Sequence, residues 1–446
     1  MNTHIVSKGC DIPMQGSAEA RCANYQGARA SYNLGDFPYL KPKLAVQKGD
    51  RVRLGQTLFA DKKAPEIVFP SPVCGVIEEI VIGERRALLQ VIIRQEGEDS
   101  VEHPKLSKDE LNTLNPESAR KKLLERGLWP MIRMRPFNKV AQVADTPACI
   151  MVTAVDSAPL APDIALCLEG RAVDFQLGLD MLARLGSKVH LCVDANHPLP
   201  EIFSGAKNCE TTAFAGPHPR GSVSVHIDAI CPVGQTPKTV WFVRAEDVAA
   251  IGRTLSSGRY DAERVFAWSG PAATGPMLYR SVQGCSLEGL GHEETPVRLI
   301  SGNALCGKNV TASPFLGYYD RQVTVLEENR RRKVLGWLAP GAKTHSLSRI
   351  FLSSLMPGGM KEFSTSRNGD HRALVDSEIY DRVQPLEIPT AFLYKAVLAG
   401  DIDEAEKLGL WSVAPEDFAL ASYVCPSKTD FCEAFQNCFD QLYREG

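Results

Sequence analysis

Eleven residues, 129–139, gather the side chains best suited to holding a flat polar group. The stretch carries aromatic rings at Trp129 and Phe137, and cations at Arg133, Arg135 and Lys139. Guanidinium groups beside aromatic rings can hold a planar polar headgroup or the acidic surface of a partner protein. A surface loop anchored by its hydrophobic residues has the same composition, and the residue types alone leave both interpretations open.

A pair of lysines is the second candidate for chemistry. Residues 44–94 contain short β-prone runs separated by Gly turns, which resemble the barrel-sandwich hybrid fold of biotinyl and lipoyl carrier domains. Lys62 and Lys63 occupy the hairpin tip where a carrier holds its acylated lysine. The flanking methionines of the carrier motif are missing, and Pro65 stiffens the turn. We therefore expect a docking module, with an acylated carrier as the alternative.

Cysteines and histidines offer no recognisable metal site. The 13 cysteines include no C-x-x-C pair, and the gaps between Cys425, Cys432 and Cys438 fit neither zinc nor iron–sulfur spacing. His218 and His226 lie eight residues apart without an acidic or cysteine partner, which favours histidines bonded to backbone. We predict no metal-binding, cofactor-binding or catalytic residues in this chain.

Composition limits the class of protein. With 446 residues the chain should hold several domains. Fifty basic against 53 acidic residues give a net charge of −3, so nucleic acid is not an expected partner. No apolar run reaches the roughly 20 residues that span a bilayer, and no signal segment is recognisable.

From residue 145 onward, strand and helix patterns alternate. Apolar runs at 149–154, 188–193, 211–214 and 240–243 predict strands, and 172–185 and 245–256 predict helices. Such alternation is typical of a Rossmann-like layer. No G-x-G-x-x-G follows any of these strands, so the phosphate-binding loop is missing.

The overall prediction is a multidomain α/β (α+β) chain. Strand patterns at 297–301 and 322–326 indicate a β-grasp (SLBB-like) domain, and a largely helical end follows, with helices expected at 346–355, 388–399, 402–408, 415–421 and 430–444. The expected parts are a lead segment (1–43), the barrel-sandwich hybrid module (44–103), a helix and Arg/aromatic linker (104–144), the Rossmann-like domain (145–279), the β-grasp domain (280–340) and the C-terminal helical domain (341–446).

This order of parts resembles the A subunit of the bacterial sodium-translocating NADH:quinone reductase (Na⁺-NQR). Matching stretches along the full length include KGCDIP at 8–13, DKKAP at 61–65, RPFNK at 135–139, GPHP at 216–219 and VCPSK at 424–428. The resemblance implies a peripheral subunit on the cytoplasmic face of the bacterial inner membrane. Its partners would be the other five subunits (B to F), chiefly the membrane-embedded B subunit, and it would have no transmembrane segment.

The resemblance also implies which chemistry belongs to the complex. The complex uses NADH, FAD, FMN, riboflavin, an iron–sulfur cluster, ubiquinone and Na⁺, while this subunit holds no tightly bound cofactor and is not catalytic alone. A quinone-proximal role is the remaining expectation. Its candidate quinone-binding residues are Phe37, Tyr39, Arg133, Arg135, Phe137 and Lys139.

Other interpretations remain open. The quinone-site segments 34–41 and 132–139 would look the same if they only docked onto a membrane protein of the complex. The carrier interpretation predicts an added cofactor on Lys62 or Lys63. A soluble flavin-dependent NADH diaphorase is a further alternative, and the missing glycine loop weighs against it.

Overall fold

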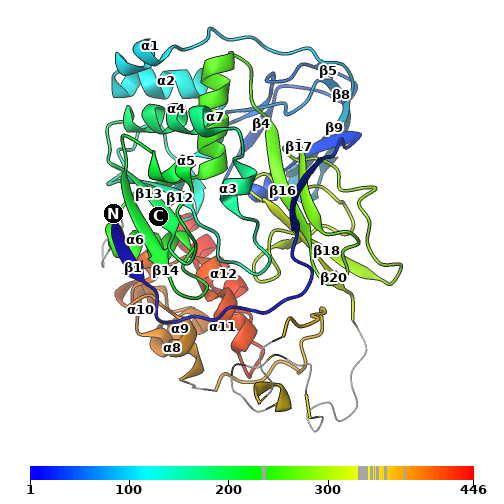
Figure 1. Ribbon diagram of the computed structural model, residues 1–446, viewed down its shortest axis with the longest axis vertical. Coiled ribbons are helices and arrows are strands. Elements are labelled where there is room, and N and C mark those ends of the chain that lie inside the picture. The colour runs from blue at the N-terminus through cyan, green and yellow to red at the C-terminus, as the bar shows by residue number, and fades with distance from the viewer. Residues whose placement is uncertain are drawn as a thin grey trace.

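A seven-stranded sheet carries most of the α/β part of the chain. The computed structural model describes residues 1–233, 238–329, 340–341, 345, 347, 351–355, 359–375 and 378–445 (Figure 1). Five neighbouring strands of this sheet run parallel, and two antiparallel strands extend one edge. In spatial order the strands are β1 (Asn2–Ile5), β14 (Glu210–Ala215), β13 (Val189–Asp194), β12 (Ile150–Ala154), β15 (Val240–Arg244), β10 (Arg133–Arg135) and β11 (Lys139–Val140).

Both faces of this sheet are apolar because both are covered, as a parallel sheet requires. Ile150 and Val152 pack into the core shared with α4 (Ala172–Ala183) and α7 (Ala245–Ser257). Their neighbour Met151 faces the opposite core, which the C-terminal helices fill. The Rossmann-like layer predicted from the alternating patterns is therefore present.

Glycine lets α4 and α7 approach closely. A Cβ on Gly178 would lie 2.0 Å from the carbonyl oxygen of Val248, and one on Gly252 would lie 1.8 Å from that of Asp174. Real Cβ atoms do not approach an oxygen so closely, so any side chain at either position would push the helices apart. The two glycines thus set the spacing of this helix layer.

The barrel-sandwich module consists of two small antiparallel sheets, as predicted. Its core includes Val52, Leu58, Phe69, Ile77 and Val91. One sheet has the order β3 (Arg29–Asn33), β9 (Leu88–Gln95), β8 (Gly75–Ile82) and β5 (Arg51–Val52). The other has the order β4 (Pro42–Leu44), β6 (Thr57–Asp61) and β7 (Val68–Pro70).

A six-stranded mixed sheet stands where a β-grasp domain was expected. Its order is β19 (Lys308–Asn309), β18 (Val297–Ser301), β20 (Gln322–Glu327), β16 (Glu263–Ser269), β17 (Met277–Val282) and β2 (Glu19–Asn24). β16 and β17 were expected in the Rossmann-like domain. They pair with β20 and β2 instead, so this sheet begins near residue 263 rather than at 280.

The first 43 residues, expected only as a lead segment, contribute strands to three different sheets. β1 pairs with β14 of the seven-stranded sheet, β2 pairs with β17, and β3 pairs with β9 of the barrel module. In Figure 1 the blue chain leaves β1 and crosses the molecule before it enters β2. Pairing between strands this far apart in sequence leaves no local pattern, which is why the sequence did not reveal it.

The Arg/aromatic stretch is likewise not a surface loop. Trp129, Met131 and Ile132 are buried, and β10 pairs antiparallel with β15. The indole N–H of Trp129 donates to the carbonyl of Ala141 at 2.7 Å. The stretch therefore extends the seven-stranded sheet.

The C-terminal part of the chain is helical, as expected. The described helices are α8 (Ile379–Val383), α9 (Thr390–Ala399), α10 (Ile402–Lys407), α11 (Ala419–Val424) and α12 (Phe431–Glu445). The helix expected at 346–355 falls largely outside the described residues, which contain only a 3-10 turn at Leu352–Ser354. Within the described part of the chain, no helix has both the length and the apolarity needed to cross a membrane.

One buried carboxylate joins the two large sheets. Asp247, in the first turn of α7, accepts from Arg321 at 2.6 Å and lies 3.3 Å from Arg264. All three side chains are at most 2% exposed. Arg264 lies on β16 and Arg321 directly before β20, so the pair of contacts ties the six-stranded sheet to the N-terminus of α7.

Asp247→Asn should destabilise the protein strongly, because it leaves two buried arginines without their counter-charge. We expect the free energy of unfolding to fall by about 3–5 kcal/mol, measured by urea denaturation followed by tryptophan fluorescence. Glu19→Gln is the matched control, since Glu19 and Arg21 form an exposed pair that should contribute less than about 1 kcal/mol. Equal losses for the two variants would contradict the structural role assigned to Asp247.

Candidate functional site

A cavity of about 1060 Å³ opens at the carboxyl ends of β12 and β15. From β12 the chain proceeds outward through β13 and β14 and then returns to place β15 on the other side of β12. In open α/β sheets, the crevice at such a reversal of strand order is where ligands bind. The cavity therefore lies where this fold predicts a binding site.

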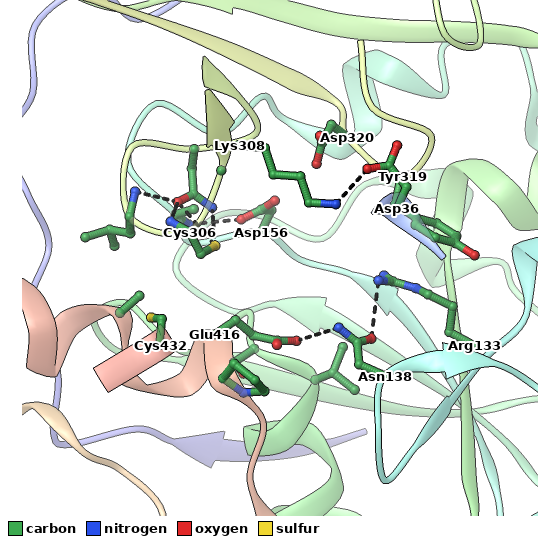
Figure 2. Close-up of a pocket in the computed structure, with 18 of the residues that line it drawn as sticks. Asp36, Arg133, Asn138, Asp156, Cys306, Lys308, Tyr319, Asp320, Glu416 and Cys432 are labelled. Carbon is green, nitrogen blue, oxygen red and sulfur yellow. Dashed lines mark hydrogen bonds and ion pairs between the residues drawn. The ribbon is translucent and has the colours of Figure 1, made fainter. Parts of the chain in front are cut away.

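Four parts of the chain supply its walls. Thr153, Phe242 and Arg244 come from the seven-stranded sheet. The lead segment and the linker, the six-stranded sheet with its preceding loops, and the C-terminal helices complete it (Figure 2). From these parts come Asp36, Phe37, Tyr39, Arg133, Asn138, Ser301, Cys306, Lys308, Tyr319, Asp320, Glu416, Cys432, Glu433, Gln436, Asp440 and Arg444.

The guanidinium of Arg133 lies within cation–π distance of two aromatic rings. The carbon of its guanidinium lies 4.2 Å from the ring centre of Tyr319 and 4.5 Å from that of Phe242. The hydroxyl of Tyr319 donates to the carbonyl of Pro130 at 2.7 Å, which fixes the first of these rings. Desolvation lowers the pKa of Arg133 to about 10, so the side chain stays charged at neutral pH.

A chain of polar contacts runs from Arg133 to the C-terminal helices. Arg133 donates to the side-chain oxygen of Asn138 at 3.4 Å, and Asn138 donates to Glu416 at 3.5 Å. Glu416 also accepts from the buried Arg135 at 2.6 Å. Figure 2 shows Glu416, Asn138 and Arg133 in this sequence along one wall. Burial opposes ionisation of Glu416, but the charge of Arg135 outweighs it and lowers the pKa of Glu416.

The opposite wall is mainly acidic. Asp36 accepts from Lys308 at 2.7 Å and from the backbone N–H of Tyr318 at 2.9 Å. Asp320 accepts from the hydroxyl of Ser301 at 2.7 Å. Burial and the neighbouring charge of Asp36 raise the pKa of Asp320. Lys308 is thus already paired with Asp36, as Figure 2 shows.

The nucleophilic side chains in the cavity are held in unreactive states. The hydroxyl of Ser157 lies 3.0 Å from Nδ1 of His218, but burial lowers the pKa of His218 to about 4, which makes it a weak base. Desolvation, followed by the charge of Glu416, raises the pKa of Cys306 to about 12, although the residue as a whole is exposed. Desolvation, followed by the charge of Cys306, raises the pKa of Cys432 to about 12 as well. Neutral thiols are poor nucleophiles, so the cavity is suited to binding rather than to covalent catalysis.

The helix end at the sheet reversal is occupied by carboxylates. In dinucleotide-binding folds the N-terminus of the helix after the strand holds a phosphate. Here α7 begins with Glu246 and Asp247, and Asp247 is paired with two arginines. Burial raises the pKa of Glu246. A phosphate at this helix end would therefore meet carboxylates.

A cluster of rings lies beside the cavity and joins three parts of the chain. Tyr39 stacks on Tyr443 of α12 with ring centres 4.0 Å apart, and Phe137 meets Tyr443 edge-on at 5.4 Å. Lys139 lies 4.8 Å from the ring centre of Tyr443. Lys63 lies 5.3 Å from the same ring and 3.4 Å from its hydroxyl. The hairpin tip that a carrier would swing freely is therefore docked on α12.

The six predicted quinone-site residues lie in one region of the molecule. Three line the large cavity, and three contact the C-terminal helices. Phe37, Tyr39 and Arg133 line the large cavity. Phe37 is 3% exposed and packs against Phe69 and Tyr318. By contrast, the other three predicted residues face the C-terminal helices. These are Arg135, Phe137 and Lys139.

Several cavity residues had no signal in the sequence. Arg244 ends an apolar strand, and Tyr319, Asp320 and Glu416 come from segments far away in sequence. The end of a strand at a reversal of strand order would have indicated Arg244, had the strand order been known. The others required the tertiary structure.

Comparisons with known proteins agree with this architecture, a modular α/β protein with a ligand-sized cavity at its sheet reversal. The NqrA N-terminal barrel-sandwich hybrid domain matches residues 5–96, and the NqrA second alpha/beta domain matches residues 114–260. Together these two matches cover the barrel module and, apart from residues 2–4 of β1, the seven-stranded sheet up to the end of α7. The class is thus a barrel-sandwich module joined to an α/β domain.

Full-length relatives identify the family. The A subunit of the Na(+)-translocating NADH-quinone reductase of Shewanella frigidimarina is 39% identical over 99% of both chains. The proteins of the same name from Pasteurella multocida and Pseudomonas aeruginosa are each 38% identical, again over 99% of both chains. This chain belongs to the family of NqrA proteins, the A subunits of the Na(+)-translocating NADH-quinone reductases. A chain of an NAD+-reducing [NiFe]-hydrogenase aligns at 15% identity with a TM-score of 0.40, over 78% of this chain and 67% of that one, which is too weak a likeness to carry any argument.

Glu416→Gln should weaken the attachment of the C-terminal helices in a pH-dependent way. Because the pKa of Glu416 is lower in the folded protein than its ordinary value near 4.3, its ion pair stabilises the fold above that value and is lost as the pH falls through the lowered pKa. At pH 7 we expect a loss of about 2 kcal/mol, measured by urea unfolding, since Glu416 is partly exposed. The difference from wild type should shrink at pH 4 and below.

Glu433→Gln is the control for that measurement, because Glu433 is an exposed residue of α12. Its effect should stay below about 0.5 kcal/mol at every pH. A loss for Glu416→Gln that does not change with pH would rule out the ion pair as its cause.

Proposed function

We propose that this chain acts as a peripheral subunit of a sodium-translocating NADH-quinone reductase, without a redox cofactor of its own. Membership of the NqrA family over 99% of the chain carries this proposal. The complex would oxidise NADH, reduce ubiquinone to ubiquinol and export Na⁺ at the bacterial inner membrane. The chain would sit on the cytoplasmic face, held by the other five subunits (B to F) and chiefly by the membrane-embedded B subunit.

Two observations support a division of chemistry between this chain and its partners. No glycine-rich phosphate loop follows a strand of the sheet, and desolvation keeps the thiols of Cys306 and Cys432 neutral. In this proposal NADH, FAD, FMN, riboflavin and the iron–sulfur cluster belong to the partner subunits. The contribution of this chain would be docking and access for quinone.

The volume of the cavity and its hydrogen-bond donors both support quinone binding. Its volume of about 1060 Å³ accommodates a substituted ring with part of its tail. Tyr39 offers a ring wall, and the edge of Arg133 offers N–H donors to a quinone carbonyl. Arg135, Phe137 and Lys139 would act indirectly, by holding residues 132–139 against α12.

A photoreactive ubiquinone analogue added to the assembled complex tests this assignment. We expect labelled peptides within residues 34–41 or 132–139, with the label removed by excess ubiquinone. Label confined to the membrane subunits would contradict quinone binding by this chain and leave docking as its role.

Arg133→Ala in the assembled complex should lower quinone reduction about tenfold, because a charge-assisted hydrogen bond to the ring is lost. NADH oxidation with an artificial electron acceptor should remain within about twofold of wild type. Arg86→Ala, at an exposed hairpin, is the matched control and should change neither activity. A parallel fall of both activities for Arg133→Ala would instead mean a role in assembly.

The intact mass and absorbance of the purified chain test the two other interpretations. We expect the 48.8 kDa mass of the unmodified sequence and no flavin absorbance. An added biotinyl or lipoyl group on Lys62 or Lys63 would restore the carrier interpretation, and a yellow protein would restore the diaphorase interpretation.

A further inference from the structure

Two arginines lie side by side on one face of the seven-stranded sheet. The register of β10 and β15 places Arg133 opposite Phe242, and cross-strand partners share a face. Arg244 follows Phe242 by two residues on β15, so it projects to that face as well. Both arginines line the large cavity at the sheet reversal.

Among the described residues, neither arginine has a carboxylate bound to it. Within that part of the chain, Arg133 makes one side-chain hydrogen bond, to the neutral amide of Asn138 at 3.4 Å, and Arg244 makes no side-chain hydrogen bond or ion pair. The guanidinium nitrogens of Arg133 and Arg244 that have no protein partner keep some accessible surface, so they are open to the cavity. In contrast, Arg135 is paired with Glu416, and Lys308 with Asp36.

The two arginines differ in the charged groups that surround them. Asp156, Glu246 and Asp320 surround Arg244, and together they raise its pKa against the effect of its burial. Around Arg133 the neighbouring cations Arg244 and Arg135 add to desolvation in lowering the pKa. The acid that acts on Arg133, Glu416, is already bound to Arg135. Tyr319 and Glu416 offset only part of the desolvation of Arg133, because its pKa stays below the ordinary value.

Two aromatic rings restrict how Arg133 can bind. The ring centres of Phe242 and Tyr319 lie 4.5 Å and 4.2 Å from the guanidinium carbon, which leaves the N–H edge of the group as the part best placed to receive a ligand. A guanidinium edge carries parallel N–H donors that match two oxygens of a carboxylate or phosphate. A neutral quinone carbonyl, with a single oxygen, would use only part of this donor set.

We propose that the cavity contains an oxyanion site, in which the edge of Arg133 binds a carboxylate or phosphate group and Arg244 supplies a second positive charge behind it. The ligand would be a small metabolite that bears this group, and it would occupy the same edge of Arg133 that a quinone carbonyl would use. This proposal goes beyond the proposed function and does not depend on it.

Isothermal titration calorimetry of the full-length chain tests the proposal, with inorganic phosphate and succinate as separate probes at constant ionic strength set by sodium chloride. We expect at least one probe to bind with one-to-one stoichiometry, and the tighter one to identify the oxyanion class. Arg133→Gln should weaken that binding at least about tenfold. Arg244→Gln should weaken it as well, because Asp156, Glu246 and Asp320 would then repel the anion.

Arg86→Gln is the control, since it removes the same charge from an exposed hairpin tip and should leave binding unchanged. Arg133→Lys keeps the charge but loses the parallel donors, so it should bind more weakly than wild type. Failure of wild type to bind either anion would overturn the proposal. Unchanged binding in Arg133→Gln, or equal loss in Arg86→Gln, would overturn it too.

A measurement on the unmutated chain tests the proposal even if a variant does not fold. Phenylglyoxal modifies accessible arginines, and peptide mass spectrometry reports each position separately. The better-binding probe should protect Arg133 while leaving Arg86 equally reactive. Modification of Arg133 that is unaffected by either anion would contradict the site directly.

Discussion

The buried contact of Asp247 with Arg264 and Arg321 is the interaction on which the rest of the molecule depends. It fixes the N-terminus of α7 against the six-stranded sheet. Tyr319 and Asp320 immediately precede Arg321 in the chain, so the same contact sets where they enter the cavity wall. The ring of Tyr319 in turn contacts the guanidinium of Arg133. A structural ion pair thereby determines the geometry of the wall on which a ligand would bind.

The sequence predicted the elements well wherever the pattern was local. The helix expected at 172–185 is α4, the strand expected at 297–301 is β18, and the helix expected at 430–444 is α12. Each depends on periodicity within one segment, which apolar residues record directly. The mistakes concern pairing between distant segments. β1, β2 and β10 join sheets whose other strands lie far away in sequence, and no spacing of residue types encodes that choice.

The residues of the candidate site likewise divide into those with a local sequence pattern and those without one. Arg133 was found because cations and rings cluster in its own segment, whereas Arg244 ends an otherwise apolar strand and was missed. The missing glycine loop was visible in the sequence, whereas the carboxylates that begin α7 at the cavity were not singled out. A Rossmann-like sheet here has a crevice at its strand reversal, and the helix end after β15 carries acidic side chains.

The pairing of β1 with β14 has a consequence for synthesis of the chain. Asn2 leaves the ribosome 210 residues before its partner Thr212. At about 5–20 residues per second, β1 waits roughly ten to forty seconds for a neighbour. β3 can pair much sooner, because its partner β9 follows within about sixty residues. The barrel module can therefore fold during synthesis, whereas the edge of the large sheet is completed only after β14 has been made.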